Sequence, residues 1–95
     1  MELKLTASKD LGCIWKENFL GCKGFLIPGE QEFALGRDMN MVLIIEKETW
    51  GTLKMVPVWA NIFAPPSQEL PRGTFFRLLS CDRELEKKIK GSCRH

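Results

Sequence analysis

Residues 32–63, EFALGRDMNMVLIIEKETWGTLKMVPVWANIF, are the stretch on which the fold depends. This stretch holds the longest apolar runs of the chain and two of its three tryptophans. Met41–Ile45 is a β-branched run of strand length, and the apolar pattern resumes from Leu53 to Phe63. We therefore predict a hairpin of two strands whose polar reversal spans residues 47–52.

The two strands of this hairpin carry different information about their neighbours. Five consecutive apolar residues at Met41–Ile45 predict a strand covered on both faces, or one whose outer face meets a partner. The second strand contains Pro57, which has no backbone N–H to donate to a neighbouring strand. We expect this strand to lie at a sheet edge or to carry a bulge at Pro57.

Further elements are predicted on both sides of the hairpin. Met1–Ala7 alternates apolar and polar residues, which is typical of a half-buried strand, and Lys23–Ile27 is a short strand ended by a turn at Pro28. Ala64–Gly73 contains three prolines and a glycine, which predicts a loop.

The end of the chain is predicted to form a helix. Ser80 is the candidate N-cap residue and Gly91 the residue that follows the last turn. Leu85 and Ile89, four residues apart, give this helix a narrow apolar stripe that would face the core.

Length and composition define the class of protein. The 95 residues predict a single domain, 1–95, which buries roughly 60 to 65% of the surface of its unfolded chain. Hydrophobic residues at 44% and charged residues at 27% are ordinary globular values, so neither a disordered nor a fibrous class is indicated. We predict a mainly β (α+β) fold, a small five- or six-stranded barrel or sandwich with one C-terminal helix.

The length of the apolar runs and the number and spacing of the cysteines predict the cellular location. No apolar run approaches the ~20 residues of a membrane span, and the first residues have no apolar core of a signal peptide. We therefore expect a cytoplasmic protein without membrane contact, in which free thiols are favoured over the three pairings that four cysteines allow. Cys13 and Cys22 are too far apart for a zinc knuckle, so no metal and no cofactor is predicted.

Catalysis finds little support in the sequence. The only histidine is the final residue, His95, and there is neither a tyrosine nor a phosphate-binding glycine loop. One enzymatic alternative stays open, a small ribonuclease that works without histidine. Glu46 or Glu48 would act as the base, and Arg72 or Arg77 would hold the phosphate.

Two short segments resemble known families. Phe33–Asp38, FALGRD, resembles the opening of forkhead-associated phosphopeptide domains, but the serine and histidine of that family do not follow at the expected place. Met39–Leu43 together with Arg72 and Gly73 is similar to the two signature segments of Sm-like RNA-binding barrels, but prolines occupy the region where that family has a strand. Neither resemblance assigns the chain to a family.

We therefore predict a non-catalytic binding domain, and single-stranded nucleic acid is the first candidate ligand. The net charge of +2 does not by itself indicate nucleic acid, but aromatic rings interleaved with cations would stack on bases and neutralise phosphates. Most aromatic residues belong to the core, whereas Trp50 lies in the predicted polar reversal. The candidate binding residues are Trp50, Lys47, Lys54, Arg72, Arg77, Lys87, Lys88 and Lys90.

Two alternatives remain open for these residues and for the partner. The lysines after Glu86 are also what the C-terminal dipole of a helix favours, without any ligand. The domain would otherwise be a protein-interaction or inhibitory module that uses Trp50, the loop Pro65–Pro71 and the strand around Pro57. A homo-oligomer formed through an edge strand is a further prediction.

Overall fold

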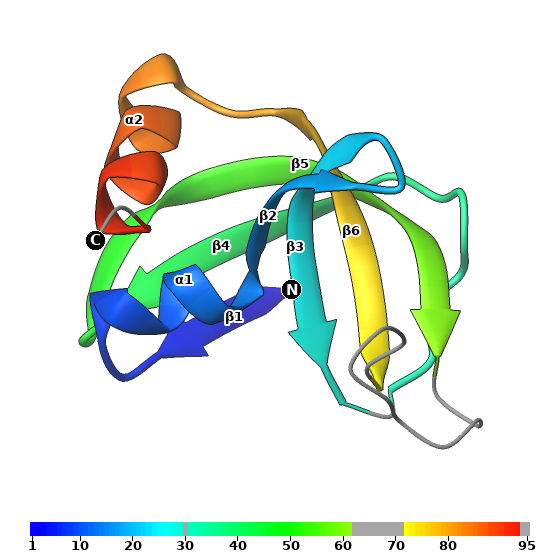
Figure 1. Cartoon of the computed structure of the whole chain (residues 1–95). Coiled ribbons are helices and arrows are strands. Elements are labelled where there is room, and N and C mark those ends of the chain that lie inside the picture. Colours follow the sequence, from blue (N-terminus) through cyan, green and yellow to red (C-terminus); the bar gives the residue numbers. More distant parts are fainter. Residues whose placement is uncertain (30, 62–71, 94–95) are drawn as a thin grey trace.

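The structure is a computed structural model that describes residues 1–29, 31–61 and 72–93. These residues form one six-stranded sheet that curls into a half-barrel, with short helical segments at its opening (Figure 1). In chain order the elements are β1 (Glu2–Leu5), a 3-10 turn (Ser8–Asp10), α1 (Leu11–Ile14), β2 (Trp15–Phe19), β3 (Cys22–Pro28), β4 (Met39–Ile45), β5 (Glu48–Asn61), β6 (Gly73–Ser80) and α2 (Arg83–Ser92). The prediction of a small, mainly β fold with a C-terminal helix is confirmed.

The strand order in the sheet is β1-β4-β5-β6-β3-β2. β1 pairs with β4 in parallel, and all other neighbouring strands are antiparallel. The predicted hairpin is therefore the β4–β5 pair, which lies inside the sheet between β1 and β6. The predicted strands at the N-terminus and at Lys23–Ile27 are also confirmed, as β1 and β3.

The reversal between β4 and β5 is shorter than predicted. Only Glu46 and Lys47 form the turn, with backbone φ angles of 54° and 68°. Two consecutive residues in the left-handed region make the tight hairpin turn that matches strand twist, usually signalled by Asn-Gly or Asp-Gly. The sequence has no such signal at Glu46 and Lys47, so the turn was predicted too late in the chain, around Gly51. Trp50 lies in β5 and not in a polar loop.

Bulges allow a proline and a tryptophan to sit in the long central strand. The β5–β6 register shifts between Pro57 and Trp59, so one of the two alternatives for Pro57, a bulge, is confirmed and the sheet edge is not. The β4–β5 register shifts between Leu43 and Ile44, which pair with Gly51 and Thr49. Trp50 is thus the additional residue of a second bulge.

The main core fills the inside of the curled sheet. Met41, Leu43 and Ile45 of β4 point into it, while the alternate residues Val42 and Ile44 lie half-buried on the outer face. The five-residue apolar run is therefore completely buried on one face only. Inward residues of the other strands and of both helices complete this core: Leu11, Ile14, Trp15, Phe25, Leu53, Met55, Phe76, Leu78, Leu85 and Ile89.

The C-terminal helix α2 covers the concave side next to the start of β5 (Figure 1). The predicted stripe is confirmed, because Leu85 and Ile89 are both buried. A methyl group placed on Gly51 would lie 2.9 Å from Leu85, so the helix packs directly on the β5 backbone. The predicted boundaries are wrong, since Asp82 is the N-cap residue in place of Ser80 and Gly91 lies inside the helix.

The prolines of the predicted loop at 64–73 fall in residues 62–71, outside the described part of the chain. Gly73 itself begins β6. Among the described helices none is long and apolar enough to cross a membrane.

Candidate functional site

The structure brings two of the predicted binding residues, Trp50 and Lys88, into contact. The Lys88 ammonium lies 4.3 Å from the centre of the Trp50 ring. Trp50 is half-buried and packs against the core below α2. This cation–π contact places a side chain over one face of the ring, which is the face that a nucleic-acid base would need.

Of the remaining predicted cations, Lys87 and Lys90 lie on α2 together with Lys88, and the others are spread over β5, β6 and the residues next to these strands. Lys54 on β5 pairs with Asp38 at 3.7 Å, and Lys90 on α2 pairs with Glu86 at 3.6 Å. Arg77 is exposed on the outer face of β6, opposite Val56. Lys47 lies in the β4–β5 turn, Lys87 is exposed on α2, and the half-buried Arg72 precedes β6 and has contacts of its own.

The groups of the ribonuclease alternative are not brought together. Glu46 and Glu48 lie at the β4–β5 turn, where β5 begins. Arg72 immediately precedes Gly73, which pairs with Asn61 at the other end of β5. Arg77 pairs with Val56 in the second half of that strand. No carboxylate–arginine pair of the predicted kind therefore meets across one site.

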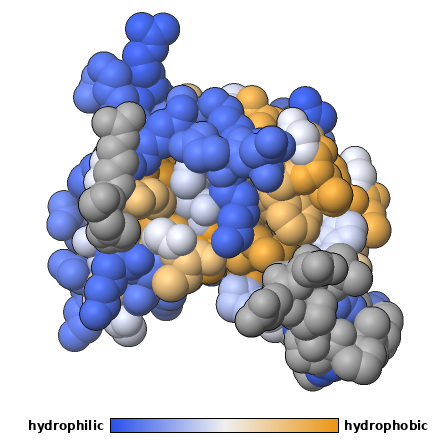
Figure 2. All heavy atoms as spheres, viewed as in Figure 1, coloured by the Kyte–Doolittle hydropathy of each residue, from blue (hydrophilic) through white to orange (hydrophobic). Residues whose placement is uncertain are grey.

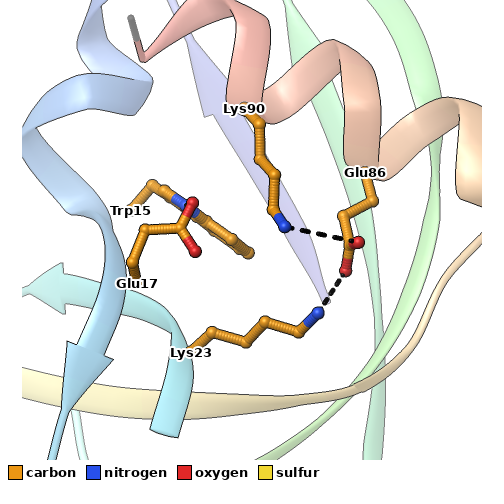
Figure 3. Close-up of polar contacts among 5 residues, drawn as sticks. All are labelled: Trp15, Glu17, Lys23, Glu86 and Lys90. Atoms are coloured by element: carbon orange, nitrogen blue, oxygen red, sulfur yellow. Dashed lines mark hydrogen bonds and ion pairs between the residues drawn. The ribbon is translucent and has the colours of Figure 1, made fainter.

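A seam of polar contacts joins α2 to the β2–β3 hairpin (Figure 3). Lys23 on β3 donates a hydrogen bond of 2.7 Å to Glu86, whose other oxygen lies 3.6 Å from Lys90. The Trp15 indole donates to Glu17 at 3.0 Å beside them. The hydrogen bond from Lys23 lowers the pKa of Glu86, and the same bond raises the pKa of Lys23.

These pKa shifts argue that the seam is structural. A carboxylate with a lowered pKa is a weak base, and an ammonium with a raised pKa is a weak nucleophile. Burial, and then the charge of Glu86, raises the pKa of the nearby Cys81 thiol, which favours the unreactive protonated form. The described residues contain no group of three or more metal-ligating side chains. All four cysteines are free thiols.

An apolar surface forms where β5 bulges. Val58 is the residue that the register shift between Pro57 and Trp59 leaves unmatched, and it is 39% exposed. Leu20, in the turn between β2 and β3, is 68% exposed, and Leu35, in the segment before β4, is 57% exposed. We call these three residues together with the half-buried Trp59 the bulge patch.

Two contacts hold the parts of the bulge patch next to each other. The Phe19 ring, which precedes Leu20, lies 5.3 Å from the Trp59 ring, edge to face. The backbone N–H of Gly36, which follows Leu35, donates a hydrogen bond of 2.8 Å to the Pro57 carbonyl. Figure 2 shows apolar side chains gathered on this side of the molecule, where the β2–β3 hairpin and the second half of β5 lie.

Sequence reasoning identified Pro57 as a contact region but did not identify Leu20 and Leu35. Both leucines directly precede a glycine in a turn, Leu20-Gly21 and Leu35-Gly36, where a large apolar side chain is not expected. That pattern is the signal that would have found them.

Comparisons with known proteins assign no function to this chain, so a proposal of function rests on the structure. No protein-family model matches the chain, and no curated protein shows significant similarity to it.

Proposed function

We propose that the protein is a non-catalytic interaction module that binds another protein through the bulge patch. The observation that carries this proposal is that the segments holding the exposed Leu20, Leu35 and Val58 meet at one bulge of the sheet. The contacts of Phe19 with Trp59 and of Gly36 with Pro57 bring these segments together. Large apolar side chains that gather on a surface are typical of protein contact sites, whereas scattered ones need no explanation.

The scaffold below the bulge patch supports this role. Phe19, Trp59 and Phe75 form a cluster of rings, with the Phe19 and Phe75 centres 4.6 Å apart. Phe75 is buried and pairs with Trp59 across β5 and β6. A rigid aromatic base limits the conformational entropy lost on binding, which is what favours affinity at an interface. The complementary partner presents apolar side chains.

A matched pair of variants tests the proposal. Val58→Glu places a charge in the bulge patch, and Leu79→Glu places one at the other end of β6, where Leu79 is 40% exposed. We expect wild type and Leu79→Glu to capture and crosslink the same protein from an extract of the cells that naturally make this chain. Val58→Glu should no longer capture that protein. A titration with the purified partner should then show a negative heat-capacity change.

Retention of the same partner by Val58→Glu, with circular dichroism equal to that of wild type, would contradict the proposal. Loss of the partner by both variants would contradict it as well, because the effect would not depend on the bulge patch.

The single-stranded nucleic-acid hypothesis stays a prediction with its own measurement. It requires Lys88 to leave the Trp50 ring so that a base can stack there. Anisotropy of labelled single-stranded RNA and DNA, titrated at low and moderate salt, measures it. Salt-sensitive binding that weakens in Trp50→Ala and Lys87→Gln would support the hypothesis, and no binding at low salt would exclude it.

We also propose a cytoplasmic location. The four free thiols support it, since free cysteines are usual in reducing compartments and disulfides in oxidising ones. Fractionation of the producing cells, followed by thiol alkylation, tests the proposal. Recovery in the soluble fraction with all four thiols reactive after unfolding is the expected result.

A further inference from the structure

β1 has one side that the described residues leave unpaired. Its partner on the other side is β4, where the Val42 N–H donates to the Met1 carbonyl at 2.9 Å and the Glu46 N–H donates to the Leu5 carbonyl at 3.0 Å. Because N–H and C=O groups alternate sides along a strand, the backbone groups of Glu2 and Lys4 face the unpaired side.

The other outer strand, β2, is a poorer edge for pairing. Its register with β3 shifts between Lys16 and Phe19, whereas the β1–β4 register is continuous over Glu2–Leu5. A bulge bends an edge strand and interrupts the row of backbone groups, which is how many sheets prevent association. β1 is therefore the regular edge of the half-barrel.

The side chains of β1 are arranged for a specific neighbour. Glu2 and Lys4 share the outer face, with side chains 57% and 70% exposed and their charged atoms 3.8 Å apart. Leu3 and Leu5 point to the core but stay half-buried, so the core is incompletely covered at this edge. A neighbouring strand with the same alternating pattern would cover Leu3 and Leu5 with its apolar side chains. It would also place its charged side chains beside Glu2 and Lys4.

We propose that β1 pairs antiparallel with β1 of a second copy of this chain, about a two-fold axis at Leu3. In this register Glu2 lies opposite Lys4 of the second copy, and Lys4 lies opposite its Glu2. Both are positions whose backbone groups face the unpaired side, so each pair exchanges two N–H···O bonds. Leu3 meets Leu3 on the inner face, and the interface is isologous.

Charge selects this register over its neighbours. A shift of two residues in one direction places Glu2 opposite Glu2, and a shift in the other direction places Lys4 opposite Lys4. Like charges directly opposite each other destabilise an antiparallel pair, whereas opposite charges stabilise it. A shift of one residue brings backbone groups that already bond to β4 into the pairing position. The Leu3-centred register alone satisfies both conditions.

The outer face beside this edge has room for the incoming side chains. A groove of about 700 Å³ runs along it and is lined by Glu2, Lys4, Ile44, Glu46, Lys47 and Thr49. The basic and acidic residues of this groove are complementary in charge to the acidic and basic residues of the same groove in a second copy related by a two-fold axis. The surface lies at the β1 edge and not in the bulge patch, so this proposal and the proposed function fail independently.

Charge-swap variants test the pairing by sedimentation equilibrium over a range of concentrations. We expect wild type to self-associate, and Glu2→Lys alone or Lys4→Glu alone to associate about tenfold more weakly, because each creates two like-charge pairs. An equimolar mixture of the two single variants should associate again, since both pairs in the mixed dimer are of opposite charge. The double variant Glu2→Lys/Lys4→Glu should regain self-association.

Circular dichroism and Val58→Glu serve as controls for folding and for association through the bulge patch. A wild-type protein that stays monomeric at the highest concentration would overturn the proposal. Self-association that the single swaps leave unchanged, or a mixture of correctly folded single variants that does not associate, would overturn it too.

Discussion

Lys23 on β3 donates a hydrogen bond of 2.7 Å to Glu86 on α2, a residue 63 positions further along the chain. Lys90, one helical turn after Glu86, lies 3.6 Å from the other carboxylate oxygen. One carboxylate thus ties the C-terminal helix to the sheet and supports the helix itself. Because Leu85 and Ile89 on α2 close the core, this contact helps to set the position of the helix over the half-barrel.

Replacing Glu86 by Gln should make stability depend less on pH. The pKa of Glu86 is lowered in the folded protein, so its contribution is present above its unfolded value and is lost as pH falls through the folded value. Both side chains are partly exposed, so we expect Glu86→Gln to lower the free energy of unfolding by up to about 1 kcal/mol at neutral pH. Urea denaturation at a series of pH values measures the difference in free energy of unfolding between wild type and Glu86→Gln. This difference should become smaller as the pH is lowered.

The control for this prediction is Glu84→Gln, which removes an exposed carboxylate from the same first turn of α2 without an ion pair to β3. It accounts for the interaction of a negative charge with the helix dipole. A difference between Glu86→Gln and wild type that stays constant from neutral to acidic pH would contradict the prediction.

Gly24 is required because two strands come close together. A methyl group on Gly24 of β3 would overlap the Phe76 carbonyl oxygen, which belongs to the backbone of β6 and has little freedom to move. We expect Gly24→Ala to cost about 3 kcal/mol of unfolding free energy, at the upper end of the usual cost of overpacking. Thermal unfolding followed by circular dichroism measures the loss.

Gly21→Ala is the matched control, because nothing lies within 4 Å of its added methyl group and its φ angle of 80° is the only source of strain. That strain costs roughly 1 to 2 kcal/mol. If both variants unfold at the same temperature, β3 and β6 are not as close as the structure places them.

Gly91 should respond in the opposite direction to the same substitution. It lies inside α2, is exposed, and has nothing within 4 Å of an added methyl group. Alanine restricts the unfolded chain and has a higher helix propensity, so Gly91→Ala should raise the free energy of unfolding by roughly 0.5 to 1 kcal/mol. Unchanged or lower stability in urea would indicate that the helix ends before residue 91.

The candidate site was only partly predictable from sequence. The strand around Pro57 was identified because a proline in a strand pattern predicts a sheet edge or a bulge. The structure has the bulge, which leaves Val58 unmatched and exposed. Leu20 and Leu35 were missed because their place beside Val58 depends on two contacts between distant segments, Phe19 with Trp59 and Gly36 with Pro57. The cations were selected by residue type and by their place in the sequence, and their arrangement in space depends on which strand or helix each occupies.

The sequence by itself determined the local elements of this protein. Alternation defines β1, the apolar run defines β4, and the spacing of Leu85 and Ile89 defines the buried face of α2, because each pattern reports burial within a few residues. Tertiary structure decided the rest: the parallel pairing of β1 with β4, the bulges of β5 and the seam from Lys23 to Glu86. These features depend on the packing of segments far apart in the chain, and local periodicity carries no information on which segments meet.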